Sequence, residues 1–447
     1  MKVFIGPTEV AGIAQGLRAG FERIGVTAEI VLEAAHPFGY GATEPDALLV
    51  RCWKWTGTLC RRLPMRHLWL KAPLALVHLM LGWPVLCWAL WRYQAFVFLA
   101  GKTLTNTKFE LWLLRLLQRP VVVIFVGSDA RPPYINGAYP ASTPQAMKRA
   151  TRRQKRKVRR LELGATVCVN APGTAHFHER PVVNWFALGF PRSLEARVDG
   201  ASTTNGDSHG SLADAPRTGT TVYLLHSPSH PAVKGTRRIE AAVQSLKARG
   251  FAVELLTLNG ASNSAVLDAL QQCDLVVDQL FSDTPMAGLA TEAAQLGKPA
   301  LVGGFFSREL RQALNGLPQP PTRFVDPDFF EVALEELVAD ADARHALGQA
   351  AKNFVQTEWA CERVAERLLR ILRGDVPPAW WLDPSSIRYL AGCGLPEDKA
   401  RERVRELVQH GGIAALALTD KPKLESAFAA WAGVNLPCLE GTTRGAT

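Results

Sequence analysis

The sequence has few cysteines, and none of them stand at the spacing of metal ligands. Its 447 residues include eight cysteines and no C-x-x-C pair. This pattern argues against a zinc site or a disulfide scaffold and favours reduced thiols in a cytosol. The N-terminal stretch MKVFIGPTEVAG holds too short an apolar core for a signal peptide. The sequence therefore predicts a cytoplasmic protein.

Acidic residues are absent from one strongly basic segment. The net charge is +10, and the run KRATRRQKRKVRR, Lys148–Arg160, holds nine basic residues and no acid. Such a run is typical of a solvated helix face, or of a surface that binds the phosphates of anionic lipid or nucleic acid. No aromatic residues are interleaved with it, so nucleic acid is not the expected partner. Both interpretations stay open, with an anionic membrane as the partner in the second.

Formal charge is also missing from a long apolar segment. Residues Ala72–Trp91 are twenty in number, carry no formal charge and are long enough to span a bilayer. Because Gly82 and Pro84 interrupt the middle, we expect a buried or half-buried pair of helices. The alternatives are a hydrophobic surface that dips into a membrane and, third, a transmembrane span. The cations that flank the segment are Arg61, Arg62, Arg66 and Lys71.

Short apolar runs alternate with helical stretches through residues 1–197. The runs are KVFIG, TAEIVLE, AFVFLA, PVVVIFVG and ATVCVN. Continuous runs of this kind are typical of buried parallel strands. This part is therefore predicted to form a Rossmann-like α/β domain.

A second alternation begins after a polar, glycine-containing segment. Residues 198–220 show no apolar periodicity and are predicted to be a flexible linker. From residue 221 to residue 375 the runs TVYLLHS, FAVELLTLNG, DLVVDQL and PALVGG again alternate with helices. The prediction is an α/β fold of two doubly wound domains that face each other across a cleft. Residues 376–447 are expected to form a small helical appendage.

One loop of the second domain combines rigidity with a lone cation. The stretch LLHSPSHPAVKGT leaves a strand, crosses prolines and reaches Lys234 just before a helix. A lysine there can hold a phosphate, and backbone N–H groups near Gly235 and Thr236 add partial positive charge. The alternative interpretation is a capped helix with a surface lysine.

The loop that follows DLVVDQL is a second candidate for binding. A helix opens near Gly288, and Glu292 lies one turn into it. The start of a helix can hold an anion, and a carboxylate can accept two hydrogen bonds from a ribose diol. The two loops together are predicted to hold a diphosphate and its ribose. The alternative is that Glu292 is an ordinary acid in the first turn of a helix.

The second domain resembles the donor-binding half of a GT-B glycosyltransferase, closest to family 4. The resemblance runs over Thr221–Leu372 through HSPSHPAVKGTRRI, DLVVDQL, GLATEAAQLGKPALVGG and AAKNFVQTEWACERVAERLLRIL. The first domain matches through KVFIGPTEVAGIAQGLRAG, VVVIFVGSDAR and VCVNAPGTAHF. Such a family implies a nucleotide-diphosphate sugar as donor, retention at the anomeric carbon, no cofactor and no metal held by a D-x-D motif.

The resemblance also implies roles for particular residues. Lys234 matches the lysine that neutralises the donor diphosphate, and Glu292 matches the second Glu of an E-x7-E motif, which holds the ribose. The first Glu falls at Thr284 and is missing; Asp283 beside it is a candidate substitute, and a loop shorter by one residue is the other explanation. The arginine common in the opening loop is missing too, and His226 is expected to assist the leaving group. The remaining predicted donor-binding residues are Ser229, Gly235, Thr236, Gly288 and Leu289.

Four residues of the first domain are predicted on the acceptor side of the cleft. In the stretch GSDAR, Asp129 and Arg131 follow a strand and either contact the sugar or acceptor or form an internal salt bridge. Gly6 and Gly12 follow the first strand.

The expected activity is transfer of a sugar from a nucleotide donor to an acceptor hydroxyl, in polysaccharide or glycolipid synthesis. The basic run and the apolar segment indicate a glycan or lipid-linked acceptor and a peripheral place on the cytoplasmic face of a membrane. A binding protein that has lost turnover, and a nucleotide-sugar epimerase on the same fold, are the alternatives.

Overall fold

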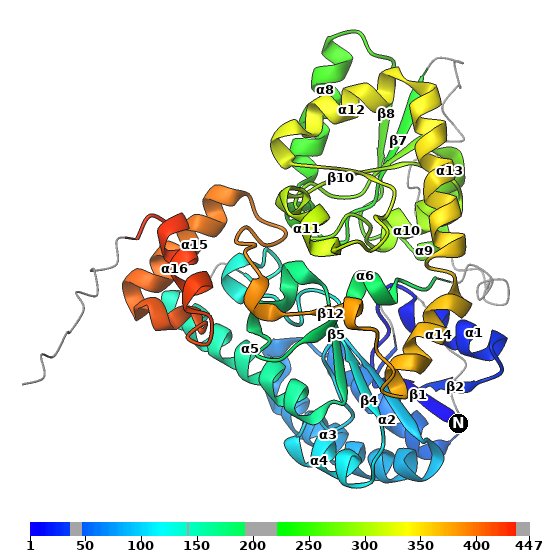
Figure 1. The fold of residues 1–447 in the computed structure, drawn as a ribbon, viewed down its shortest axis with the longest axis vertical. Coiled ribbons are helices and arrows are strands. Elements are labelled where there is room, and N and C mark those ends of the chain that lie inside the picture. Colours follow the sequence, from blue (N-terminus) through cyan, green and yellow to red (C-terminus); the bar gives the residue numbers. More distant parts are fainter. Residues whose placement is uncertain (36–46, 141–142, 193–220, 435–447) are drawn as a thin grey trace, which may run out of the picture.

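Two parallel sheets, each flanked by helices, form the body of the protein in a computed structural model (Figure 1). The structure describes residues 1–35, 47–140, 143–192 and 221–434. The linker expected at residues 198–220 lies outside this part. The two sheets confirm the predicted fold class of two Rossmann-like domains, the arrangement that the GT-B resemblance implies.

The first sheet has the strand order β12-β6-β5-β4-β3-β1-β2, and only β12 runs antiparallel to its neighbour. Its strands are continuous apolar runs, and the central ones are fully buried because helices cover both faces. The strands are β1 (Lys2–Gly6), β2 (Thr27–Ile30), β3 (Ala95–Leu99), β4 (Val121–Ile124), β5 (Val167–Asn170), β6 (Val182–Asn184) and β12 (Trp381–Leu382). The helices are α1 (Ile13–Arg23), α2 (Leu48–Arg62), α3 (Leu68–Arg92), α4 (Lys108–Leu116), α5 (Pro144–Gly164) and α6 (Trp185–Leu188), with the 3-10 helix η3 (Pro172–Phe177).

The second sheet has the order β11-β10-β9-β7-β8 and is parallel throughout. Its strands are β7 (Val222–His226), β8 (Val253–Thr257), β9 (Leu275–Val277), β10 (Ala300–Gly303) and β11 (Arg323–Val325). The helices of this domain are α7 (Pro231–Lys234), α8 (Thr236–Ala248), α9 (Asn263–Gln272), α10 (Gly288–Gln295), α11 (Leu310–Leu314), α12 (Phe330–Ala339) and α13 (Ala341–Thr357). The carboxyl ends of β7 and β9 lead into the two loops that the sequence singled out.

The chain returns to the first domain earlier than expected. Helix α14 (Cys361–Leu372) was predicted within the second domain, but it packs on α1, where Arg23 and Glu362 form an ion pair of 2.8 Å. Trp359, which precedes α14, packs against Trp185 of α6 in the first domain, with the ring centroids 6.0 Å apart. Gly20 of α1 leaves no room for a side chain against the backbone of Cys361, which lets the two helices approach closely.

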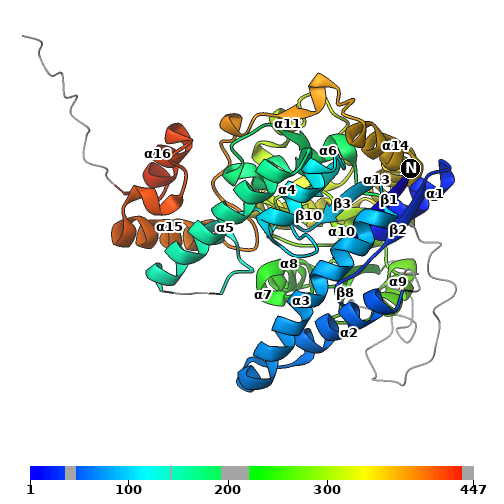
Figure 2. The same ribbon diagram turned by 90° about the horizontal axis from the view of Figure 1, so that it is seen from below.

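The C-terminal appendage is helical, as predicted, but the chain leading into it also contacts both domains. Helix α15 (Glu397–Gly411) lies beside α5, and α16 (Pro422–Trp431) packs on α15 (Figures 1 and 2). Before them, β12 joins the first sheet, and Cys393 and Gly394 bond to both domains: the N–H of Cys393 donates to Ile135 (3.1 Å) and that of Gly394 to Phe281 (2.8 Å). Residues 435–447 of the predicted appendage lie outside the described part.

The apolar segment Ala72–Trp91 belongs to one continuous helix, so the predicted helix pair is wrong. Helix α3 runs through Pro73 and Pro84 without ending. Its buried residues are confined to the C-terminal half, at Gly82, Val85, Leu86 and Ala89. Contacts of this half with the first domain sustain the helix despite the two prolines.

Candidate functional site

A cavity of about 430 Å³ lies between the two domains. Among the predicted residues, Lys234, Glu292, Ser229, Gly288 and Leu289 line it. The first domain contributes Glu9, Val10, Ala11 and Arg192, and the second adds Ser227, Pro228, Gly260, Ala261, Asn263, Val266 and Asp278. The two loops therefore meet at one cavity, at the carboxyl ends of parallel strands.

Lys234 ends the short helix α7 and reaches the floor of this cavity. Its Nζ donates a hydrogen bond of 2.6 Å to Oε1 of Gln279 and lies 3.5 Å from Oδ1 of Asp278. The Asp278 carboxylate is buried, so the lysine charge partly compensates it. The Lys234 side chain keeps 20% of its surface exposed, and the ammonium remains reachable by an anion in the cavity.

Glu292 lies on α10 and forms a buried ion pair with Arg192. Its Oε1 also accepts a hydrogen bond of 2.9 Å from Nδ2 of Asn263. Gln295, one turn further on, donates to the backbone oxygen of Arg192 (2.5 Å) and fixes the arginine from behind. Glu292 is therefore more than an ordinary first-turn acid, since it faces the cavity and connects the two domains.

Glu9 is a third charged group at this end of the cavity. Its carboxylate accepts hydrogen bonds of 3.3 Å from the N–H groups of Ala14 and Gln15 at the start of α1. Burial raises the pKa of Glu9, and the backbone N–H groups and the charge of Arg192 oppose that effect. Gly12, at φ 81°, lies beneath the Arg192 guanidinium, and a side-chain carbon here would come within 3.2 Å of Nη1. Gly12 thus supports the site from behind without lining it.

His226 does not line the cavity, so the geometry gives its predicted role at the leaving group no support. The ring is fully buried, with Nδ1 2.8 Å from the Val277 oxygen and Nε2 2.9 Å from Oγ1 of Thr236. Burial lowers the pKa of His226, which keeps the ring neutral. Both ring nitrogens therefore serve to join β7, β9 and α8.

Gly235 and Thr236 are also structural in this arrangement. Gly235 adopts φ 77°, and a side chain there would collide with Leu280. Thr236 is buried, and its hydroxyl is bonded to His226. Neither residue lines the cavity, so their predicted place in the donor site is not supported.

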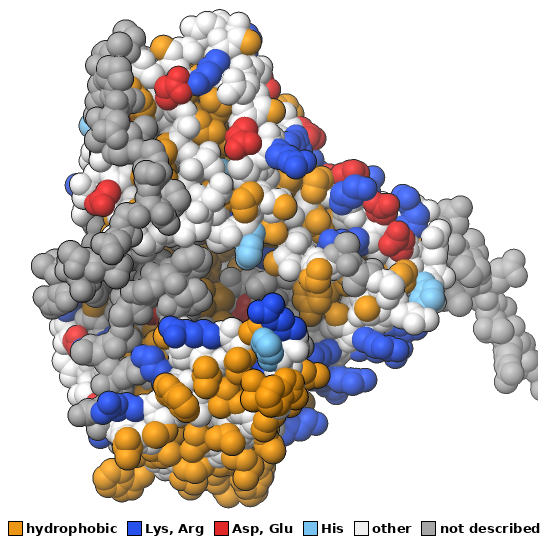
Figure 3. Space-filling view, turned by 180° about the vertical axis from the view of Figure 1, so that it is seen from behind, with side chains coloured by type: hydrophobic (Ala, Val, Ile, Leu, Met, Phe, Trp, Pro, Cys, Tyr) orange, Lys and Arg blue, Asp and Glu red, His pale blue; other side chains and the backbone are white. Residues whose placement is uncertain are grey.

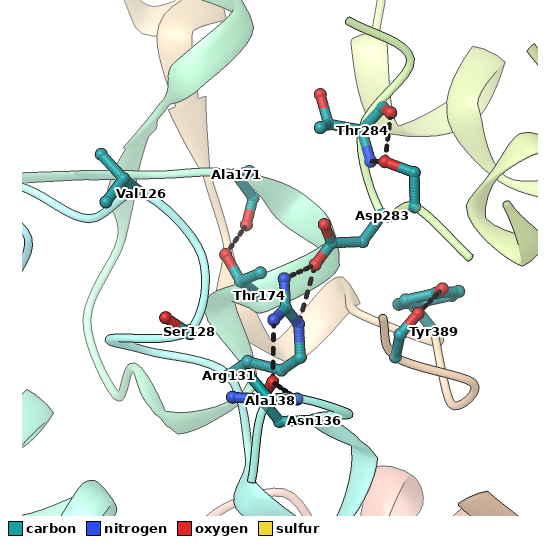
Figure 4. Close-up of polar contacts among 12 residues, drawn as sticks. Val126, Ser128, Arg131, Asn136, Ala138, Ala171, Thr174, Asp283, Thr284 and Tyr389 are labelled. Carbon is teal, nitrogen blue, oxygen red and sulfur yellow. Dashed lines mark hydrogen bonds and ion pairs between the residues drawn. The ribbon is translucent and has the colours of Figure 1, made fainter. Parts of the chain in front are cut away.

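Asp283 is held by Arg131, which corrects two predictions at once. Nε of Arg131 donates to Oδ2 of Asp283 at 2.9 Å, and Nη2 forms a second contact with the same oxygen (Figure 4). Both side chains are buried, and Nη1 of Arg131 also donates to Asn136 at 3.4 Å. The Asp283 carboxylate is bound to a residue of the other domain. Asp283 is therefore not in a position to replace the missing first Glu of the E-x7-E motif. Neither does Arg131 pair with Asp129 in the internal salt bridge that was considered.

A smaller cavity of about 180 Å³ adjoins the first one. It shares Val10, Ala11 and Gly288 with the larger cavity and is lined mainly by apolar residues of the first domain. Thr284 and Asp283 border it. The two cavities together form a continuous interdomain site with a charged part and an apolar part.

Asp129 and Gly6 lie near the site but do not enter it. The Asp129 carboxylate accepts a hydrogen bond of 3.0 Å from the N–H of Val126 and so closes its own loop. Burial raises the pKa of Asp129, which the nearby Lys157 opposes. A side chain at Gly6 would collide with the carbonyl of Val31.

Sequence reasoning missed Arg192, Glu9, Asn263 and Asp278. Arg192 stands in GFPRS, directly before the polar segment, where no periodic pattern marks it. Asp278 had a signal, because it ends a strand in DLVVDQL at the carboxyl edge of the sheet.

A broad apolar face lies outside the cleft, on the first domain (Figure 3). Within the described residues, α3 is the helix that is long and apolar enough to cross a membrane. Its N-terminal half is exposed, and Trp69 keeps 73% of its surface in solvent. The exposed apolar side chains of the face are Trp55 of α2, Leu68, Trp69, Leu70, Leu76, Val77, Leu79 and Met80 of α3, and Phe109, Trp112 and Leu116 of α4.

Helix α5 carries the basic run beside α4. Arg149, Arg152, Arg153 and Arg156 are exposed, and their spacing places them on one stripe of the helix. The other five cations make contacts within the protein: Lys148 donates to Gly411, Lys155 pairs with Asp420, Arg159 pairs with Glu179, and Arg160 donates to Asn106. Lys157 lies near the carboxylate of Asp129. The basic run therefore presents one exposed stripe of arginines on α5, and its other cations make contacts within the protein.

Comparisons with known proteins give no family assignment. No family model matches the sequence, and no curated protein matches it. Among solved structures, an MnaA from S. aureus with UDP is 14% identical, with a TM-score of 0.42, over 84% of this chain and 97% of that one. The Anabaena protein Alr3699/HepE with UDP-glucose is 13% identical (TM-score 0.42; 83% and 99%). The glycosyltransferase SnogD from Streptomyces nogalater is 13% identical (TM-score 0.39; 83% and 99%). These likenesses are low, so the function has to be argued from the site.

Proposed function

We propose that this protein transfers a sugar from a nucleotide-diphosphate sugar to an acceptor hydroxyl. The observation that carries the proposal is a single interdomain cavity lined by both Lys234 and Glu292. A cation at the end of one strand–helix loop suits a diphosphate, and a carboxylate on the next suits a ribose diol. Both come from the domain that resembles the donor-binding half of a GT-B glycosyltransferase.

In the proposed reaction Lys234 stabilises the negative charge that develops on the leaving diphosphate. This kind of electrostatic stabilisation acts strongly in a cavity that excludes bulk water. Following the resemblance, the leaving phosphate itself takes the acceptor proton, the anomeric configuration is retained, and no D-x-D-bound metal or cofactor takes part. No side chain of the protein is assigned as general base.

Binding without turnover is a second candidate, and one observation favours it. Thr284 occupies the place of the first Glu of the motif, and Asp283 is already bound by Arg131. No carboxylate on this loop is therefore free to contact the donor sugar within the described structure. A protein that holds a nucleotide sugar without transferring it fits the same cavity.

A panel of UDP-, GDP- and TDP-sugars, followed by proton NMR, separates these functions. Release of nucleoside diphosphate that depends on an added glycan or lipid-linked acceptor supports transfer. A change of sugar configuration with release of free sugar supports an epimerase, and ligand-detected binding without any product supports the binding protein. If no nucleotide sugar binds at about 1 mM, the cavity is not a donor site and all three functions fail.

The acceptor in this proposal is carried by a membrane. The apolar face of α2, α3 and α4 is larger than the scattered exposed residues of an ordinary soluble surface. Its Lys and Arg neighbours in Figure 3 suit an anionic bilayer. Because the C-terminal half of α3 packs in the domain, we infer that the helix lies in the interface and does not span the bilayer. We propose on this basis that the protein binds peripherally to the cytoplasmic face of the membrane.

A further inference from the structure

A second polar cavity, of about 360 Å³, lies on the other side of η3 from the interdomain site. It is enclosed by the edge of the first sheet at β6 and β12, by α11 of the second domain and by residues 379–389. Figure 1 shows β12 and α11 at the boundary between the two domains. Its volume is that of a small-molecule site, about 300–1,000 Å³. Pro172 lines this cavity, and Ala171 and Thr174 line the smaller interdomain cavity, so η3 borders both.

One wall of this cavity is aromatic. Trp381 keeps 38% of its surface exposed, and the buried rings of Tyr389 and Phe306, which also line the cavity, have their centroids 5.0 Å apart. Trp381 is held by antiparallel pairing of its backbone with Val183. The indole is thus a fixed apolar platform, since it sits on a strand rather than in a loop.

The opposite wall offers hydrogen-bonding groups that the fold does not use. The side chains of Glu309, Gln312 and Asn315 line the cavity and make no hydrogen bond with any described residue. Other polar groups of the lining are engaged. Asn184 donates to Ala313 (2.9 Å), Asp383 accepts from Ser385 (2.9 Å) and Arg388 donates to Ser385 (2.8 Å).

The charge of the lining limits the class of ligand. It contains two carboxylates, Glu309 and Asp383, against one guanidinium, Arg388, so it disfavours a phosphate or another anion. Its many polar side chains disfavour a lipid chain. A sugar ring presents an apolar C–H face to an aromatic platform and hydroxyl groups to amides and a carboxylate.

We propose that this cavity is a second carbohydrate-binding site, which takes a neutral oligosaccharide with one ring on Trp381 and hydroxyl groups on Glu309, Gln312 and Asn315. Binding there does not depend on the proposed transfer reaction. Its position next to η3 suits the distal part of a glycan whose reacting end lies in the interdomain site.

Calorimetry and saturation-transfer NMR on the full chain, with cellotetraose, chitotetraose and maltotetraose as probes, test this site. We expect at least one probe to bind with a Kd on the order of 1 mM, as few hydrogen bonds and one stacked ring provide. Trp381→Ala is expected to weaken binding about tenfold, and Gln312→Ala, an exposed change on α11, about threefold. Trp112→Ala, at a more exposed tryptophan on the apolar face, is the control and should bind like the wild type.

Saturating UDP distinguishes this site from the interdomain cavity. Unchanged oligosaccharide affinity in the presence of UDP supports a separate site. Displacement by UDP would place the sugar in the donor cavity and overturn the proposal. It is overturned as well if no probe binds at about 10 mM, or if Trp381→Ala and Gln312→Ala both bind like the wild type.

Discussion

Arg131 of the first domain and Asp283 of the second form a buried ion pair across the cleft, with Nε 2.9 Å from Oδ2. The charges of both groups are taken out of water, so each depends on the other. The same loops carry residues of the interdomain site on either side. The ion pair therefore fixes the relative position of the two halves of that site.

Removing one member of this pair is expected to destabilise the protein strongly. Arg131→Met should lower the free energy of unfolding by about 3–5 kcal/mol, because it leaves the Asp283 carboxylate buried without a partner. The double variant Arg131→Met, Asp283→Leu should recover most of that loss. Urea titrations followed by circular dichroism measure both. A single variant as stable as the wild type would contradict the buried arrangement.

Lys234→Ala should weaken binding of UDP or GDP by about 1.5–3 kcal/mol, the usual range for a charge-assisted contact. The fold should persist, because the lysine side chain is partly exposed and its partners lie on one wall of the cavity. Lys247→Ala, an exposed lysine paired with Glu254 outside the cavity, is the control. Equal nucleotide affinity of both variants in calorimetry would remove Lys234 from the donor site.

Glu292 and Arg192 should behave as a coupled pair. Glu292→Gln alone, or Arg192→Gln alone, is expected to lower both stability and nucleotide affinity, because each leaves a buried charge without its counter-ion. A double-mutant cycle should give a coupling free energy of about 1–3 kcal/mol. If Glu292→Gln keeps full stability and loses only affinity for ribose-containing ligands, the ion pair is not structural. If the two effects simply add, the pair carries no coupling at all.

The apolar face predicts binding to membranes by two separable forces. Replacing Trp69, Leu76 and Met80 with Gln should abolish sedimentation with any liposome, without loss of stability, because these side chains are exposed. Replacing Arg149, Arg152, Arg153 and Arg156 with Gln should remove the preference for anionic liposomes, at about 1 kcal/mol for each cation. High salt should have the same effect as the arginine replacements and should not reproduce the effect of the apolar replacements. If the wild type does not sediment with anionic liposomes, the proposal of a membrane-bound acceptor is contradicted and a soluble acceptor takes its place.

Buried histidines predict a loss of stability in mild acid. Burial lowers the pKa of His176 to about 4, while its Nε2 lies 2.7 Å from the Tyr389 oxygen and donates to it. The unfolded chain therefore takes up this proton first, and the contribution to stability is complete above about pH 6.5 and is lost as the pH falls towards 4. The loss is on the order of 2 kcal/mol, visible as a falling urea midpoint between pH 7.5 and 5. His176→Gln keeps a hydrogen-bond donor for the Tyr389 oxygen and should flatten the decline of the urea midpoint. If the decline is equally steep in this variant, groups other than His176 cause it.

The alternation of apolar runs and helices was enough to predict both domains and the edge at which the site lies. Lys234 and Glu292 were found because each follows a strand end at a helix start, which is a local pattern. His226 was misplaced because a buried and a cleft-facing histidine at a strand end look the same in a sequence. Only the contacts with Val277 and Thr236 decide between them.

The residues that the sequence did not reveal are those that act across domains. Arg192 and Glu9 become neighbours of Glu292 only when the two sheets come together, and no spacing in the chain records that distance. Helix α3 was misjudged because Gly82 and Pro84 were weighed without the tertiary contacts of Val85 and Leu86. Local propensity predicts the elements, and long-range packing decides how they are used.

The return of the chain at Trp359 has a practical consequence for chimeras. Because α14 and β12 complete the first domain, a clone that stopped before the second sheet would lack the cover of α1 and the last strand of its own sheet. In the topology of the chain, the second sheet is an insertion within the first domain. On either side of that insertion in the chain, Trp185 and Trp359 pack together, with their ring centroids 6.0 Å apart. A donor module grafted at these two points is expected to leave the fold of the first domain intact and carry its nucleotide preference with it.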